Sequence, residues 1–505
     1  MLVLLPFFIS VRDVAVWEGS IVDALWTERV ARSLAGSLLL ALTSAVGGAF
    51  IGVPAAYFLS RYKVPFSKVW VILFTLPLVI PSYISAYSYL AAFDQYGFYE
   101  NIFGIPFIFQ LRGSLFGAWI SMVMVNFPFV FLLTYSALIN LPGSLEESAL
   151  TLGLNKRQVF FRVILPNVKI PIISGMLLIA LYSLSDFGTP ALMNYKTLTF
   201  ELYRFWDTGR LNQSSIFCLL LMLIAFMILF LESMINRKSH YSLKNKSCRP
   251  AAKAELSLKS KGAVLTYFSL VISIAIILPL ATIIYWTMQG KKKFLLPDQL
   301  GEIASNSLVL AGMTAAFALL FALPFSWFAI REKGVFSYAA DKISFLGNMI
   351  PGAVIALALI GFFVSFRIGE FTLYQTLAMP VIGCTIRFLP QAVSALKTAL
   401  AQINPNLEEA SLTLGKSPAA TLGKVTLPLL GSGIVSAIAL VFILTIKELP
   451  ITLMLSPPGK TYLTGVIWNY IDDAEYSRVA VPALSLLIIS AISLFFILKQ
   501  NKKTN

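Results

Sequence analysis

Long apolar stretches separated by short polar segments make up most of this chain. A membrane-spanning helix needs about 20 mostly apolar residues, and the pattern reaches that length many times. It predicts spans near 35–60, 67–93, 115–138, 170–192, 216–235, 263–287, 304–330, 343–367, 376–400, 431–455 and 478–497. A further span is expected at the start, where residues 1–10 are apolar but too few to cross. Either this first helix is truncated or its true start lies upstream. The pattern therefore predicts an all-α polytopic membrane protein with about 12 transmembrane helices.

The composition supports this class. Of 505 residues, 58% are hydrophobic and 12% are charged, whereas a soluble chain carries about 25% charged residues. The formal net charge is +15. However, Lys and Arg gather in short segments between apolar stretches, which is typical of cytoplasmic loops and not of a nucleic-acid interface. We expect lipid contact and no nucleic-acid partner.

Candidate metal ligands and catalytic residues are few. Cys218, Cys248 and Cys384 are too scattered for a metal-ligand set or a disulfide framework, and His240 lies in a basic segment. We find no nucleophile–base arrangement, so neither an enzyme nor a metal site is predicted. Gly415-Lys416-Ser417 and Gly459-Lys460-Thr461 lack the rest of a phosphate-binding loop. We therefore expect no cofactor bound by this chain.

Two polar segments repeat each other 262 positions apart. The first repeated segment, residues 145–166, reads LEESALTLGLNKRQVFFRVILP, and the second, residues 407–428, reads LEEASLTLGKSPAATLGKVTLP. Upstream, Pro54 matches Pro324 and Arg61 matches Arg331 at an offset of 270, so the first copy carries about eight extra residues between the two regions. A repeat of this length predicts two like-oriented copies of one membrane domain.

The repeat and the charges predict the domains and their orientation. We expect a first membrane domain at 1–235, a basic linker at 236–262 and a second membrane domain at 263–505. Arg61, Arg331, the basic residues of the linker and those near Lys499 fall on one face, which is cytoplasmic by the positive-inside rule. Both repeated segments and both termini are expected there. Lys291–Lys293 is the exception, on the outer side.

Each repeated segment predicts a short exposed helix followed by a sharp turn. Acidic residues favour the first turn of a helix, and glycine favours its end. The residues in these roles are Glu146, Glu147, Glu408 and Glu409 for the start, Gly153 and Gly415 for the end, and Leu165-Pro166 and Leu427-Pro428 for the start of the next span. Such a helix suits docking by a soluble partner; the alternative is an ordinary amphipathic helix at the membrane surface.

The repeated pattern resembles a known signature. Glu-Ala-Ala, three residues, Gly, nine residues, an aliphatic residue, any residue and Leu-Pro is similar to the cytoplasmic signature of bacterial ABC import permeases. Ala149 and Ala410 are the alanines retained in the two copies, and serine replaces the other alanine in each. The resemblance covers essentially the whole chain. It implies a type I ABC importer-like permease, multi-pass in the bacterial inner membrane.

The resemblance also implies partners and site residues. Two copies of an ATP-binding subunit would dock on the repeated segments, with Glu147, Gly153, Glu409 and Gly415 in the coupling role. A periplasmic substrate-binding protein would deliver the cargo.

Two carboxylates inside predicted spans are candidates for the translocation path. Asp186 and Glu448 are again 262 positions apart, and acids within spans are costly and often functional. The alternative is structural: Asp186 caps a helix break at Gly188-Thr189-Pro190, and Glu448 pairs with Lys447 or caps near Pro450. Arg387, whose counterpart is Val125, is expected to be an ion-pair partner or interface residue.

The sequence around these carboxylates looks like that of fused two-domain permeases for ferric iron. The stretches are Ser185-Asp186-Phe187-Gly188 and Lys447-Glu448-Leu449-Pro450. Thiamine, polyamine and phosphonate importers of the same class remain alternatives. An ion-gradient-driven secondary transporter is the alternative from another class.

Overall fold

The structure, a computed structural model, describes residues 5–15, 27–106, 109–209, 211–239, 251–290, 297–332, 334, 347, 350–365 and 373–501. His240, Cys248, Lys291–Lys293 and much of the linker lie outside the described residues. So do residues 1–4 of the expected first span and both ends of the span expected near 343–367.

The described residues confirm an all-helical chain with many apolar spans. Eight of their helices are long and apolar enough to cross a membrane, or up to ten if two bent helix pairs each count as one span. The two other expected spans coincide with the shorter helices α1 (Leu5–Ala15) and α18 (Gly352–Ser365). Predicted and observed spans therefore agree in place.

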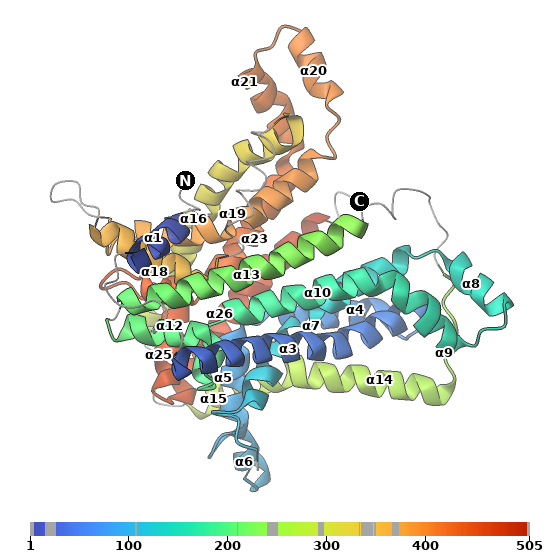
Figure 1. Ribbon diagram of the computed structural model, residues 1–505, viewed down its shortest axis with the longest axis horizontal. Coiled ribbons are helices and arrows are strands. Elements are labelled where there is room, and N and C mark those ends of the chain that lie inside the picture. Colours follow the sequence, from blue (N-terminus) through green and yellow to red (C-terminus); the bar gives the residue numbers. More distant parts are fainter. Residues whose placement is uncertain are drawn as a thin grey trace. The chain divides into compact units, whose positions relative to one another are not determined.

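The chain forms two compact units, and each holds one repeated segment. The first-copy unit comprises Gly19–Arg204 and Leu220–Gln289. Its helices are α3 (Glu28–Arg61), α4 (Ser67–Thr75), α5 (Ser82–Phe93), α6 (Phe98–Phe103), α7 (Leu115–Asn140), α8 (Gly143–Thr151), α9 (Lys156–Val159), α10 (Leu165–Ser185), α11 (Gly188–Leu192), α14 (Leu258–Ile272) and α15 (Leu278–Gln289). Helices α3, α7 and α10 pack on one another as its core (Figure 1).

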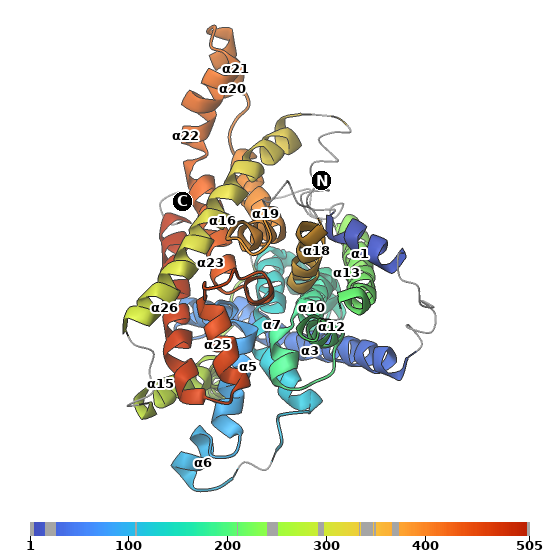
Figure 2. The same cartoon turned by 90° about the vertical axis from the view of Figure 1, so that its left-hand side faces the viewer.

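The second-copy unit comprises Met1–Glu18, Phe205–Leu219 and Gly290–Asn505. Besides α1 and α18 it contains α16 (Pro297–Arg331), α19 (Ala378–Leu400), α20 (Asn406–Thr413), α21 (Pro418–Thr421), α22 (Leu427–Leu429), α23 (Gly431–Ile446), α24 (Pro450–Met454), α25 (Leu463–Asp472) and α26 (Tyr476–Asn501). Helices α16, α19 and α23 form its core, and Figure 2 shows α20 to α22 extending beyond it. The boundary between the units falls within α12 (Leu198–Asp207) and α13 (Leu211–Ser239).

The two units repeat details of packing as well as helix order. In the first, the Ser37 hydroxyl of α3 accepts a hydrogen bond from the Leu198 backbone N–H at 2.8 Å. In the second, the Ser307 hydroxyl of α16 accepts one from the Leu463 N–H at 2.9 Å. Each bond satisfies a backbone donor at the first residue of a short helix, α12 or α25, where no intrahelical acceptor exists. The duplication thus extends to buried polar contacts.

The opening helix of each copy packs in the unit of the other copy. Helix α1 packs on α18, and α14 and α15 pack on α3, α4 and α5. Three side chains make hydrogen bonds in the latter contact: Tyr267 donates to the Ile51 carbonyl at 2.6 Å, Tyr89 to Ile274 at 2.8 Å and Trp286 to Ala91 at 3.0 Å. Residues 263–289, which chain order assigns to the predicted second domain, therefore pack in the first-copy unit.

Several expected spans are bent or broken. The helices Ser67–Val79 and Ser82–Phe103 meet at 94°, because Pro81 lacks an N–H and forces Ile80 into extended backbone. Helix α10 ends at Ser185 before α11, and α23 ends at Ile446 before α24. We call residues 186–187 the first break and residues 447–449 the second break. Both candidate carboxylates lie at these breaks.

Candidate functional site

The first repeated segment forms the helix and turn that its sequence predicts. Helix α8 ends in a left-handed Gly153 with φ +84°. The Leu154 N–H bonds to the Ala149 carbonyl at 3.1 Å, and the Gly153 N–H to Leu150 at 3.0 Å. This pair of bonds is the Schellman motif, which uses up helix-end carbonyls. Asn155 and Gln158 then cap α9 reciprocally.

The second repeated segment has the same geometry. Helix α20 ends in Gly415 with φ +79°, and the Lys416 N–H bonds to the Ser411 carbonyl at 3.2 Å. The Ser417 hydroxyl caps α21. In both copies a five-residue π-helical turn follows, Phe160–Ile164 or Leu422–Thr426, before Leu-Pro begins the next helix. Both glycine turns are thus confirmed as structural features.

A buried arginine ties each repeated segment to its core. At the end of α3, Arg61 Nε lies 2.6 Å from Glu146 Oε1, and its Nη1 donates to the Leu138 carbonyl of α7 at 2.8 Å. Arg331 at the end of α16 repeats this, with 2.8 Å to Glu408 Oε2 and 3.1 Å to the Ile403 carbonyl. The arginine therefore joins two core helices to the short helix.

These ion pairs link residues whose partners the sequence did not predict. In the sequence, Arg61 and Arg331 indicated only the orientation of the chain. Glu146 and Glu408 indicated only the first turn of a helix. The repeat could have indicated these ion pairs, because both residues of each pair occur in both copies. Burial raises the pKa of Glu146, and the positive charge of Arg61 opposes that rise. The pair is charge-assisted and mostly out of water, so removing one partner leaves a buried charge.

Each repeated segment exposes one acid and one strongly exposed leucine at equivalent positions. Glu147 and Glu409 are exposed, whereas Ala149 and its counterpart Ser411 are buried. Leu152 is 83% exposed and Leu414 is 81% exposed. Ala410, Pro166 and Pro428 are also exposed, and Leu165 and Leu427 are half-buried. The exposed leucine and carboxylate that recur in both copies are available for contact with another protein.

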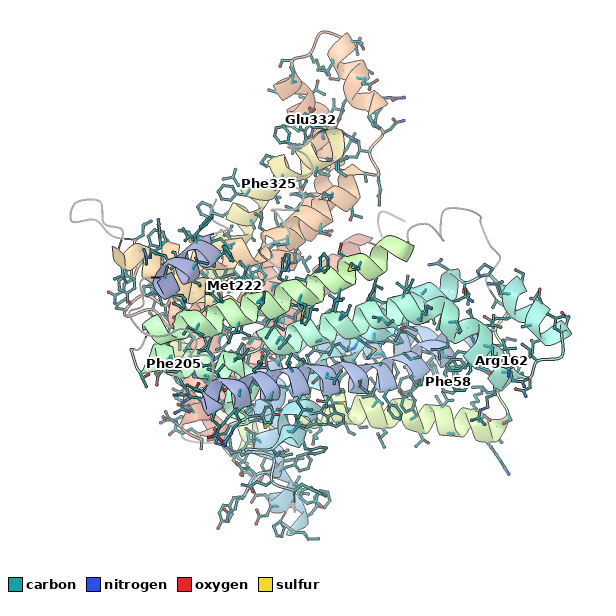
Figure 3. The ribbon with its side chains drawn as sticks, in the orientation of Figure 1. Phe58, Arg162, Phe205, Met222, Phe325 and Glu332 are labelled. Carbon is teal, nitrogen blue, oxygen red and sulfur yellow. The ribbon has the colours of Figure 1, made fainter. Side chains whose placement is uncertain are left out.

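Residues 251–255 of the linker lie against the first repeated segment. Ala254 pairs with the end of α3: its N–H bonds to the Arg61 carbonyl at 2.9 Å, and its carbonyl accepts from Lys63 at 3.0 Å. Lys63 Nζ also lies 2.9 Å from Glu255 Oε1. Figure 3 marks this end of the unit with Phe58 and Arg162, and the corresponding end of α16 with Glu332.

A pocket of about 230 Å³ opens between α3, α8 and the linker. Tyr57 and Tyr62 contribute aromatic walls, and Leu150 and Ala251 contribute aliphatic ones. Glu147 is at the same pocket, so linker and repeated segment present one continuous surface. The linker is thus part of the first copy's candidate docking surface.

The two membrane carboxylates are held in different ways. Asp186 accepts a hydrogen bond from the Ser82 hydroxyl at 2.7 Å and from the Thr189 N–H at 3.0 Å. The second contact caps α11, as the structural alternative predicted. Glu448 is buried, and its Oε2 lies 3.2 Å from Arg387 Nε, which confirms the ion-pair expectation for Arg387. That the carboxylates face one another across a two-fold axis stays a prediction.

Two copies of one helical membrane domain, each with a charged helix break and an exposed helix–glycine turn, are the features of a membrane transport permease. The comparisons name its family: the model for the binding-protein-dependent transport system inner membrane component matches residues 48–234 and 322–504. The chain belongs to this family, in which ATP-binding subunits and a periplasmic binding protein are partners. It is a multi-pass protein of the inner membrane and a transport subunit, not an enzyme.

Three similar proteins with curated names are also permease proteins of transport systems. The chain is 29% identical over 504 residues to the Fe(3+)-transport system permease protein FbpB 2 of Haemophilus influenzae, covering 98% of this chain and 95% of the relative. It is 23% identical to the ferric transport system permease protein FbpB of Actinobacillus pleuropneumoniae, covering 98% and 77%. It is 30% identical over 260 residues to a putative 2-aminoethylphosphonate permease, PhnV, of Salmonella paratyphi A, covering 49% and 96%.

Proposed function

We propose that this permease imports ferric iron, delivered by a periplasmic binding protein. The observation that supports this cargo is the similarity to two ferric transport permeases, each of which matches 98% of this chain. The phosphonate relatives match only half of the chain. Fe(III) is a hard cation that prefers oxygen ligands, so carboxylates in the spans are compatible with it. Asp186 and Glu448 are proposed to lie along the translocation path.

We propose further that two ATP-binding subunits dock on α8 and α20 at the cytoplasmic face, and that ATP binds only to them. Glu147, Gly153, Glu409 and Gly415 form the proposed coupling surfaces. Both termini and the linker would share that side of the membrane.

The geometry suggests how closure of the ATP-binding subunits would act on the membrane helices. From Lys156 to Ser185 the first copy is one helix of 30 residues, about 45 Å long at 1.5 Å per residue, and it ends at Asp186. A movement of α8 would therefore be carried to the first break through a continuous helix. In the second copy the equivalent path bends by 71° between Leu429 and Gly431.

The cargo is tested by reconstituting the permease with its ATP-binding subunit and cognate binding protein in lipid vesicles. We expect ATP-dependent accumulation of radioactive ferric iron that thiamine, polyamines and 2-aminoethylphosphonate do not inhibit. Accumulation of one of those compounds in place of iron would overturn the cargo assignment. A second candidate, 2-aminoethylphosphonate, is kept because of the 30% identity to PhnV. Accumulation driven by an ion gradient without ATP would overturn the importer mechanism.

A further inference from the structure

The two helix breaks are built from three pairs of equivalent residues. Ile80-Pro81-Ser82 aligns with Ile350-Pro351-Gly352 at the offset of 270, so Gly352 stands where the first copy has Ser82. Val125 and Arg387, and Asp186 and Glu448, correspond at the offset of 262. In the first copy, the Ser82 hydroxyl donates a hydrogen bond to the Asp186 carboxylate. In the second copy, the Arg387 guanidinium pairs with the Glu448 carboxylate instead.

Gly352 is needed because the ion pair occupies the space of a side chain. A Cβ at this position would lie 2.3 Å from Glu448 Oε1 and 2.4 Å from Arg387 Nη1. Non-bonded carbon and oxygen or nitrogen atoms do not approach so closely, so even an alanine would push the two charged ends away. A serine here, as in the first copy, would therefore require the charged ends of Arg387 and Glu448 to move from their observed positions. The loss of the hydroxyl and the gain of the guanidinium belong together.

We infer that Gly352, Arg387 and Glu448 act as one unit in which Arg387 is a positioning residue for the second break. The guanidinium holds the Glu448 carboxylate of residues 447–449 against α19, and Gly352 of α18 leaves room for both. The ion pair thereby ties α19 to the break that follows α23, and α18 packs beside both on α19 and α24. Glu448 anchors this break through its ion pair, in addition to the place on the translocation path proposed above. The inference about these three residues rests on the proposed function only for the identity of the cargo.

Four variants test this inference: two disrupt the ion pair, one introduces the residue types of the first copy, and one removes both charges. R387V and G352S each break the pair and leave the other residues in place, and a buried charge without its partner is strongly destabilising. The triple variant G352S/R387V/E448D restores a hydroxyl donor and a shorter carboxylate, as in the first copy. R387V/E448Q removes both charges, a change that is often nearly neutral for stability.

Two readouts separate the outcomes: the thermal unfolding midpoint of the purified importer complex, and ATP-dependent uptake of radioactive ferric iron in vesicles. We expect R387V and G352S to lower the midpoint by several degrees and uptake about tenfold or more. We expect the triple variant, which keeps a carboxylate at position 448, to recover both readouts, and R387V/E448Q to recover the midpoint. The midpoint needs no cargo, so it decides whether the three residues form a unit even if the cargo is not iron.

Two results would overturn the inference. An R387V variant with unchanged midpoint and uptake would show that the pair positions nothing. A triple variant no better than R387V would show that the three positions are independent.

Discussion

At the scale of single residues, the arginines that end α3 and α16 determine how the repeated segments are held. Each guanidinium contacts a carboxylate on the short helix and a carbonyl at the end of a neighbouring core helix. The same arrangement occurs twice with nearly the same distances. We therefore attribute to it the fixed position of α8 and α20 on their cores.

Replacing Arg331 with alanine should destabilise the second repeated segment. Glu408 would be left mostly buried without its charge partner, at a cost of about 3–5 kcal/mol. The control R331M/E408L replaces both charges with apolar side chains and should be much closer to wild type. Thermal unfolding of the detergent-solubilised complex measures both. An R331A variant as stable as the control would contradict the role of the pair.

The glycine turns should tolerate asparagine but not valine. A Cβ at Gly153 or Gly415 would have no atom within 4 Å, so the cost of a substitution comes from the positive φ alone. Asparagine adopts left-handed backbone readily, whereas a β-branched residue there is strained by about 1–3 kcal/mol. G153V and G415V should lower iron transport per ATP hydrolysed, and G153N should change it little. Equal iron transport per ATP hydrolysed in G153V, G415V and G153N would contradict a role of the glycine turns in coupling.

Residue-scale features differ in how far the sequence predicted them. Gly153 and Gly415 were predictable, because a helix end at glycine depends on neighbours in sequence. The Arg61–Glu146 pair was not, because it joins positions 85 apart that only helix packing brings together. The Ser82–Asp186 and Arg387–Glu448 contacts belong to the same category, although the repeat indicated that Arg387 differs from its counterpart.

At the scale of elements, close approach of α19 and α23 requires a small residue in α23. A Cβ on Gly433 would lie 2.4 Å from the Ala399 Cβ, whereas one on Gly431 would have no atom within 4 Å. G433A should therefore destabilise the second-copy unit by about 1–3 kcal/mol through overpacking. G431A, two residues away, should be neutral or slightly stabilising. The unfolding midpoints of the two variants compare them directly, and equal midpoints would contradict the packing.

The linker contact should persist at neutral pH and weaken in acid. The hydrogen bond from Lys63 lowers the pKa of Glu255 below its ordinary 4.5. Its stabilising effect is therefore present above pH 4.5 and is lost as the pH falls through the lowered folded value. The same bond raises the pKa of Lys63 above 10.5, so that contribution is lost only as the pH rises through the raised value.

Hydrogen exchange of residues 251–257 measures this contact. We expect protection of the Ala254 N–H at pH 7 and less in acid, after correction for intrinsic rates. A254P removes this donor and should release the segment, whereas A252P leaves the bridge donor in place. Equal protection of the segment in both variants would contradict the bridge.

Element positions were largely predictable from apolar periodicity, but their shape was not. The spans expected near 115–138 and 376–400 coincide with α7 and α19. The span expected near 67–93 is bent, because Pro81 lies within a stretch that hydropathy alone reads as continuous. Hydropathy also carries no information on which helices pack together, so the packing of α14 and α15 in the first-copy unit appeared only in the structure.

At the scale of the whole molecule, the duplication is the central feature. Both units repeat the three-helix core, the buried arginine pair and the glycine turn, so one chain carries two equivalent docking surfaces. The copies differ in two ways: the linker forms part of the first docking surface, and the helix breaks use different donors. We expect these differences to make the two halves unequal in coupling.

The most direct test of the account is to label the two exposed leucines from each side of the membrane. In a chain whose three cysteines are replaced by serine, L152C and L414C would each be treated with a membrane-impermeant maleimide in oriented vesicles. We predict labelling from the cytoplasmic side only, and protection of both sites when the ATP-binding subunit is bound. Labelling of either site from the periplasmic side, or no protection by that subunit, would contradict the account.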